Sequence, residues 1–163
     1  MSSSNDTARP KVTYLFGRVN RVLRRRLGEV LRPFEISVAQ YTTLSVLQVR
    51  GNLSNAELAK RAFITPQAMN EVMQGLEALK LVTRRPSESH GRIVQLLLTQ
   101  RGLDLLERCD RAVSRMEQSM LEGLSASGTE TLAKALMTCI RALEHPQAVP
   151  PARAPRLASE PET

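Results

Sequence analysis

Apolar residues in the first part of the chain recur at steps of three and four positions, the spacing that places them on one face of an α-helix. The first such run covers residues 12–34. Pro33 predicts its end, because the residue before a proline is pushed out of helical backbone geometry. A second long run covers residues 103–124, and a shorter one follows from 132 to 143. The pattern therefore predicts long amphipathic helices on both sides of a central region.

The central region has the sequence signals of three shorter helices. Two of them begin with a capping box, in which a serine and a residue three positions later satisfy free backbone N–H groups. The third begins with a threonine followed by a proline, whose missing N–H costs nothing at a first helical position. These starts are Ser37 with Gln40, Ser54 with Glu57, and Thr65 with Pro66, and the predicted helices run about 37–50, 54–62 and 65–80. Ser127 with Glu130 is interpreted as a further capping box that opens the last helix.

After Lys80 the hydrophobic period changes from 3.6 to 2, which is typical of β-strands. Residues 81–85 and 92–98 are predicted strands, and the polar loop PSESHGR between them predicts a β-hairpin. Two short helices joined by a tight turn at Phe63 and Ile64, followed at once by a hairpin with arginines at both ends, predict a winged helix-turn-helix. The fold class is therefore mainly α with a small β-hairpin wing and long N- and C-terminal helices.

The predicted domain organisation is one folded domain over residues 11–145. Its winged helix-turn-helix occupies about 37–98, and the long helices occupy about 11–33 and 100–145. Residues 1–10 are polar, and residues 146–163 hold five of the nine prolines, so both ends are expected to be disordered.

The charge balance indicates a polyanionic partner. The 163 residues carry 23 Lys+Arg against 16 Asp+Glu, a formal net charge of +7 with a pI near 10.2. Nucleic acid fits this excess better than an anionic membrane surface. With no tryptophan, two tyrosines and three phenylalanines, the chain lacks the aromatic platforms that hold single-stranded bases, which favours duplex DNA.

Several other classes of protein are excluded by the sequence. No apolar stretch is long enough for a membrane span, and the N-terminus has no signal-peptide core, so a cytoplasmic protein is expected. Cys109 and Cys139 are too few for a disulfide framework and have no metal-ligand spacing with either histidine. No phosphate-binding glycine loop, nucleophile elbow or metal-binding motif is present. The sequence predicts no enzyme, and neither a metal nor a cofactor.

The polar side of the predicted 65–80 helix carries the candidate base-reading residues. Met69, Val72, Leu76 and Leu79 share one stripe, which is predicted to face the core. Gln67, Asn70 and Gln74 lie on the other side, where amide groups can bond bidentately to adenine. No arginine or lysine lies between Thr65 and Gln74, which predicts a DNA site with important A·T pairs. The alternative is that these amides are only solvated.

Basic residues around this helix are the candidate backbone contacts. Arg84, Arg85 and Arg92 bracket the hairpin, and Arg92 is expected to enter a narrow minor groove. Phosphate contacts, which set register without reading sequence, are assigned to Ser54, Lys60, Arg61 and Thr65. Exposure for solubility alone is the alternative for the hairpin arginines.

Residues 65–102, TPQAMNEVMQGLEALKLVTRRPSESHGRIVQLLLTQRG, resemble the recognition helix, wing and LT-x-x-G signature of MarR-type regulators. The order of predicted helices extends the resemblance over about 12–144. Two positions differ from the family pattern. His90, which we include among the DNA-contact candidates, stands where the family usually has an aspartate that orients the tip arginine. Glu71 stands where many members have a basic residue, so no guanine contact is implied there.

The resemblance implies that the first helix and the last two form an obligate homodimer, which would bind an inverted-repeat operator. It also implies a small-molecule pocket between these helices and the winged region. We hypothesise a benzoate-like or hydroxynicotinate-like aromatic acid held by Arg18 and walled by Tyr14 and Tyr41. The expected function is thus a repressor released by an aromatic acid. A cysteine-based redox sensor and a sequence-indifferent DNA-binding protein remain the alternatives.

Overall fold

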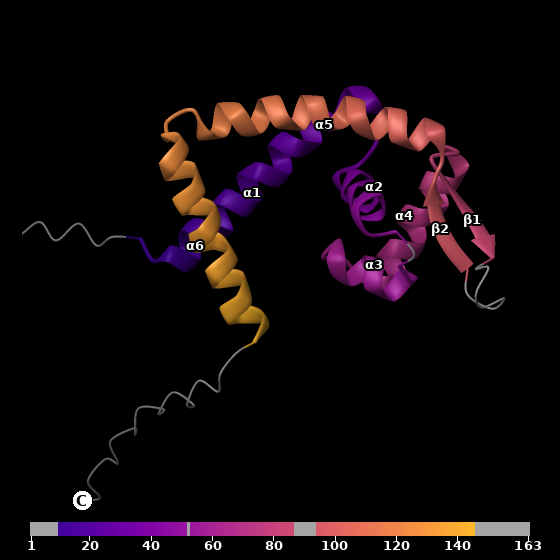
Figure 1. Cartoon of the computed structure of the whole chain (residues 1–163), viewed down its shortest axis with the longest axis horizontal. Helices are drawn as coiled ribbons and strands as arrows, with labels where there is room; N and C mark the ends of the chain where they lie inside the picture. Colours follow the sequence, from indigo (N-terminus) through magenta and orange to yellow (C-terminus); the bar gives the residue numbers. More distant parts are fainter. Residues whose placement is uncertain (1–9, 52, 87–93, 146–163) are drawn as a thin grey trace, which may run out of the picture. The chain divides into compact units, whose positions relative to one another are not determined.

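The computed structural model of the protein describes residues 10–51, 53–86 and 94–145. Along these residues the chain forms α1 (Val12–Leu31), the 3-10 turn η1 (Arg32–Phe34), α2 (Val38–Arg50), α3 (Asn55–Arg61), α4 (Pro66–Ala78), β1 (Val82–Pro86), β2 (Val94–Leu98), α5 (Gln100–Leu121) and α6 (Ala126–Glu144) (Figure 1). The predicted order and fold class are confirmed. Pro33 lies in the 3-10 turn that ends α1, as the pattern predicted.

The three short helices begin where their capping signals predicted. The Ser37 hydroxyl accepts a hydrogen bond from the Gln40 amide nitrogen at 3.1 Å, and the Gln40 side chain accepts one from the Ser37 amide nitrogen at 2.8 Å. Ser54 and Glu57 form the same reciprocal pair at the start of α3. Local side-chain to backbone bonds therefore determine where these helices start.

The prediction for the start of α6 was wrong. This helix begins at Ala126, and its N-cap is Ser125, whose hydroxyl accepts from the Gly128 amide nitrogen at 3.1 Å. Glu130 does not complete a capping box and instead forms an ion pair with Lys134 one turn later, at 2.6 Å. Ser125 and Ser127 both offer a capping hydroxyl, and the glutamate three positions after Ser127 favoured the wrong one.

The hydrophobic core of the described residues lies within the winged helix-turn-helix region, the end of α1 and the start of α5. Helix α2 packs against α1, α3, α4 and β2, so it is the centre of this region. The fully buried side chains come from every one of these helices, and they include Leu31, Leu44, Leu58, Met69, Met73, Leu76, Leu81, Leu106 and Cys109. Burial of this kind stabilises a fold by about 25 cal/mol per Å² of apolar surface.

Helix α4 buries a slightly different stripe from the predicted one. Met69, Met73 and Leu76 are at most 1% exposed, and Val72 is half-buried against the core. Leu79 was predicted to face the core, but it is 38% exposed because it is the C-cap residue, where the helix already ends.

The hairpin is a two-stranded antiparallel sheet. Val82 pairs with Leu98, Arg84 with Leu96 and Arg85 with Gln95. Val82 and Leu96 are buried and anchor the base of the hairpin in the core. The tip of the hairpin, with His90 and Arg92, and residues 1–9 and 146–163 of the predicted disordered ends lie outside the described residues.

The chain divides into two compact units after Met120. In the N-terminal unit, α1 buries only Leu31, while apolar side chains from Val12 to Val22 stay exposed. In the C-terminal unit, none of the residues of α6 is buried. None of the helices that the structure describes is long and apolar enough to cross a membrane.

Candidate nucleic-acid interface and effector cavity

Helix α4 presents the predicted row of amide side chains to solvent. Thr65 starts the helix by accepting a hydrogen bond from the Ala68 amide nitrogen at 3.1 Å. With one side of α4 held in the core, Gln67, Asn70 and Gln74 are all exposed on the other. The orientation that base reading requires is therefore present.

Asn55, which no sequence pattern indicated, connects α3 to this row. Its side-chain nitrogen donates to the Asn70 side-chain oxygen at 2.9 Å and to the Pro66 carbonyl oxygen at 3.4 Å. The bond holds the Asn70 amide in place, and no partner among the described residues takes the Asn70 amino group. Asn55 lies 15 positions from Asn70, so no local pattern could have predicted the pair.

The four residues predicted to contact phosphate differ in whether their polar groups are already engaged in hydrogen bonds. Lys60 and Arg61 are exposed in the last turn of α3. The Thr65 hydroxyl uses an oxygen lone pair for capping and keeps its proton for donation. The Ser54 hydroxyl instead donates to the Glu57 carboxylate at 2.6 Å, and this bond lowers the pKa of Glu57. The resulting negative charge makes the start of α3 the least suitable phosphate site of the four.

The described part of the wing holds two of the predicted arginines. The Arg84 guanidinium forms an ion pair with Glu77, near the end of α4, so this arginine joins the wing to α4. Arg85 follows it in β1, paired with Gln95. His90 and Arg92 fall in the segment that the structure does not describe, and their roles remain predictions.

The LT-x-x-G signature ties the end of α4 to the start of α5. The Thr99 hydroxyl donates to the Lys80 carbonyl at 2.7 Å and accepts from the Gly102 amide nitrogen at 3.0 Å. A Cβ on Gly102 would lie 2.1 Å from the Leu81 carbonyl oxygen, which leaves room for glycine alone. The signature therefore fixes α5 against the base of the wing.

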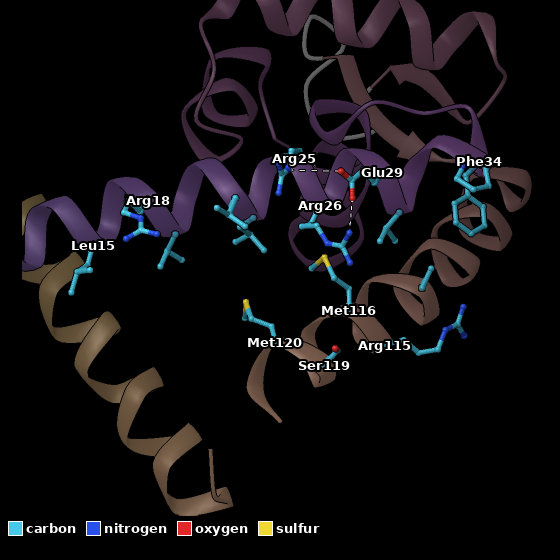
Figure 2. Close-up of a pocket in the computed structure, with 16 residues that line it drawn as sticks. Leu15, Arg18, Arg25, Arg26, Glu29, Phe34, Arg115, Met116, Ser119 and Met120 are labelled. Carbon is cyan, nitrogen blue, oxygen red and sulfur yellow. Dashed lines mark hydrogen bonds and ion pairs between the residues drawn. The ribbon is translucent and has the colours of Figure 1, made fainter. Parts of the chain in front are cut away.

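Helices α1 and α5 line a partly open cavity of about 1020 Å³ within the N-terminal unit. Figure 2 shows Met116 and Met120 extending from α5 towards α1, and most of the lining is apolar. Four arginines and one glutamate supply the charge, namely Arg18, Arg25, Arg26, Arg115 and Glu29. Glu29 pairs with Arg26 at 2.7 Å and lies 3.8 Å from Arg25, so the cavity has an excess of positive charge.

The three predicted ligand residues do not meet in this cavity. Arg18 lines it, and its guanidinium carbon lies 5.9 Å from the centre of the Tyr14 ring, which is itself not part of the lining. Tyr41 packs on the core and donates a hydrogen bond to Asp110 at 2.8 Å. The α5 wall of the cavity, including Arg115 and Ser119, was missed, because the sequence does not show which face of α5 meets α1.

Burial governs the chemistry of Tyr41 and Cys109. Burial, together with the hydrogen bond to Asp110, raises the pKa of Tyr41 to about 12. Burial and the nearby Asp110 charge raise the pKa of the Cys109 thiol to about 11. A redox-sensing cysteine needs exposure and a lowered pKa, and Cys109 has neither.

Comparison with known proteins agrees with this geometry. The sequence pattern that defines the MarR family matches residues 34–93 of this chain. The HTH-type transcriptional repressor Rv2887 of Mycobacterium tuberculosis is 38% identical over 113 residues, which cover 69% of this chain and 81% of that protein. The crystal structure of Rv2887 with salicylic acid superposes with a TM-score of 0.69 at 33% identity, covering 81% of this chain and 98% of that one. The Rv2887 structure with DNA gives a TM-score of 0.68 at 31% identity, with 80% and 98% covered. The protein is a member of the MarR family of winged helix-turn-helix transcriptional regulators.

Proposed function

We propose that the protein is a repressor that binds an inverted-repeat operator as a homodimer and releases it when a small aromatic acid binds. The observation that carries the DNA-binding part is the solvent-facing amide row of α4, held in place by the buried opposite face of the same helix. An α-helix fits the major groove, which is about 12 Å wide. Gln67, Asn70 and Gln74 then lie where base edges are read, with adenine as the preferred base for each amide.

The homodimer is supported by exposed apolar surface on α1 and α6. Six apolar side chains of these two helices are between 37% and 64% exposed, namely Val12, Phe16 and Val19 on α1 and Leu132, Leu136 and Ile140 on α6. Exposed apolar stripes of this length mark protein–protein contacts. A two-fold dimer presents α4 twice and therefore requires an operator with two inverted half-sites, about one helical turn apart.

The effector class is supported by the composition of the α1–α5 cavity. Its excess arginine favours a carboxylate, and its apolar walls favour a ring. Rv2887, solved with salicylic acid, is a relative that binds such a molecule. A complete switch from bound to released needs about 5.5 kcal/mol of differential affinity. One ion pair cannot supply this, so burial of the ring must contribute.

The size of the cavity connects the effector to the dimer. At about 1020 Å³ it is at the upper end of ligand pockets, which hold about 300–1,000 Å³, and far larger than one aromatic ring needs. A second copy that covers part of the groove would reduce it to the size of the ligand. Ligand binding and the spacing of the two α4 helices would then be coupled through α1 and α5.

DNA reading is tested with a duplex enriched from a randomised pool by the wild-type protein. Gln67→Ala and Gln74→Ala should each weaken binding about tenfold, since one good base contact contributes about 1–3 kcal/mol. Lys60→Ala should reduce the slope of log affinity against log salt concentration by about 1, because it removes a phosphate contact. Gln48→Ala, an exposed glutamine on α2, is the matched control. Equal affinity for the enriched duplex and bulk DNA would contradict sequence reading.

Effector binding is tested with sodium salicylate, with phenol as the ring that lacks a carboxylate. Salicylate should lower the affinity of the wild-type protein for the enriched duplex, and Arg18→Ala should blunt this response. Arg21→Ala removes an exposed arginine of α1 that does not line the cavity, and it should respond as the wild type does. If Arg18→Ala released DNA normally, the assignment of Arg18 would be wrong.

A further inference from the structure

The turn that joins α3 to α4 holds an aromatic residue where helices usually end with glycine. The Phe63 amide nitrogen donates to the Lys60 carbonyl at 3.3 Å, and the Ile64 amide nitrogen donates to the Ala59 carbonyl at 3.1 Å. This pair of bonds is a Schellman motif, which requires a left-handed residue at the position of Phe63. Phe63 has φ of 56°, a conformation that a bulky side chain adopts only at a cost in free energy.

The other end of α4 has the same motif with a different side chain. The Lys80 amide nitrogen donates to the Glu77 carbonyl and the Leu81 amide nitrogen to the Leu76 carbonyl, both at 2.9 Å, and Lys80 has φ of 57°. Lys80 is a flexible polar residue that water solvates well. The aromatic ring, and not the backbone conformation, is therefore what is unusual at Phe63.

The Phe63 ring has almost no contact with the rest of the described chain. It is 87% exposed, more than any other large hydrophobic side chain among the described residues. The next residue, Ile64, packs on the core. One exposed apolar residue is ordinary on a protein surface. An exposed ring on an unfavourable backbone, in a turn that glycine would fit better, contributes little to the stability of the described fold.

The position of Phe63 indicates what the ring contacts. It lies two residues before Thr65, the N-cap of α4, so the chain allows at most about 7 Å between their Cα atoms. Exposed Lys60 and Arg61 precede it in the same turn. When the start of α4 enters a major groove, this turn lies at the groove edge, where the sugar–phosphate backbone runs. Deoxyribose carbons are the apolar surface available there.

We propose that the Phe63 ring packs against the deoxyribose of the DNA backbone at the edge of the major groove, and so positions the start of α4. This inference rests on the proposed function. The contact is apolar and independent of base sequence, so Phe63 acts as a positioning residue beside the cationic groups that attract phosphate. The aromatic side chain has only two rotatable bonds, so ordering it costs little entropy.

The test compares Phe63→Gly and Phe63→Asn with the wild type on the same enriched duplex. Glycine and asparagine both tolerate the left-handed conformation. Each variant should bind DNA about tenfold more weakly, a loss of about 1.4 kcal/mol, while the urea midpoint of unfolding does not fall. The salt slope should stay that of the wild type, because no phosphate contact is removed.

Two controls separate the ring from the backbone and from exposed apolar surface in general. Lys80→Gly changes the equivalent position of the second Schellman motif, and Val49→Ala shortens another side chain that is 75% exposed. Both should bind the duplex with wild-type affinity.

Wild-type affinity in both Phe63 variants would overturn the inference, as would a fall in unfolding midpoint that parallels the loss of binding. A salt slope smaller by about 1 would also overturn it, since that is the signature of a lost phosphate contact. If the wild-type protein enriches no duplex, the proposed function itself fails. If it does and the variants bind equally well, only the role of Phe63 fails.

Discussion

The winged helix-turn-helix region and the long helices α1 and α6 bury their apolar residues in opposite ways. In the winged region, side chains such as Leu44, Leu58 and Leu76 have no exposed surface at all. Helix α1 buries only Leu31, and α6 buries no residue, although both have a regular apolar stripe. Helices α1 and α6 nevertheless share an amphipathic sequence pattern with α4 of the winged region.

An amphipathic sequence pattern therefore predicts a helix, but it does not predict which partner covers the apolar face of that helix. The winged region finds its partners within its own chain, because α2 lies between α1, α3, α4 and β2. The stripes of α1 and α6 remain available to a second copy, as the proposed dimer requires. Substitutions in the two regions should therefore differ in how their effects depend on protein concentration.

The largest effect is expected from the double variant Leu136→Asp with Ile140→Asp on α6. Both residues are exposed in the single chain, at 37% and 46%, so the variant should keep its helical content. Burying each side chain contributes about 1.5–3 kcal/mol, and each occurs twice in a dimer. The dimer dissociation constant should rise at least about 1,000-fold, or about 4 kcal/mol, measured by sedimentation velocity over a dilution series.

The matched control for this variant is Val49→Asp, which places a charge on an exposed residue of α2 outside the stripes. It should leave the dimer intact. A double variant of α6 that sedimented as the wild type does at every concentration would refute a role for α6 in the dimer.

A core truncation in the winged region should reduce stability by a smaller amount that does not depend on concentration. Leu76 is fully buried in α4, and Leu76→Ala should lower the free energy of unfolding by about 2–5 kcal/mol. Leu79→Ala in the same helix removes a side chain that is 38% exposed and should cost about 1 kcal/mol or less. Urea denaturation at two protein concentrations measures both. Equal losses would show that the α4 stripe is assigned wrongly.

Glycine-to-alanine substitutions should have opposite signs in the two regions. At Gly102 a Cβ would overlap the Leu81 carbonyl oxygen, so Gly102→Ala should destabilise the fold by about 1–3 kcal/mol.

At Gly28, in α1, a Cβ meets no atom within 4 Å in the single chain. Gly28→Ala should therefore stabilise the helix by about 0.5–1 kcal/mol. Thermal unfolding measures both variants. If Gly28→Ala destabilised the protein instead, a second copy would have to contact α1 closely at Gly28.

The last expected effect is a loss of stability at alkaline pH, and it originates in the core region. Tyr41 and Cys109 have pKa values of about 12 and about 11 in the fold, above their ordinary values of 10.0 and 9.0. The unfolded chain therefore loses these protons first, and stability should fall as the pH rises above about 9. Cys109→Ala should remove the part of this decline that lies between about pH 9 and 11.

The same property predicts the reactivity of the thiol. Cys109 should react with iodoacetamide at pH 8 in the unfolded protein and hardly at all in the native one. Rapid native labelling at Cys109, identified by mass spectrometry, would restore the redox alternative.

Features set by neighbouring residues could be predicted from the sequence. The starts of α2, α3 and α4 follow from caps that span three positions, and the change of period after Lys80 predicted the hairpin. Where two local signals competed, at Ser125 and Ser127, the prediction chose wrongly. At Leu79 the periodic pattern continued past the point where hydrogen bonding ends the helix.

The amino-acid sequence by itself determined the order of the elements, the outward amide row of α4 and the basic character of the surface, because each depends on local spacing or on composition. Only the tertiary structure decided that Asn55 holds Asn70 and that the Leu81 carbonyl leaves no room for a side chain at Gly102. It also decided that Arg18 lines the α1–α5 cavity whereas Tyr41 packs on the core. These contacts join residues far apart in the chain. Their geometry depends on how whole helices pack, which no local pattern contains.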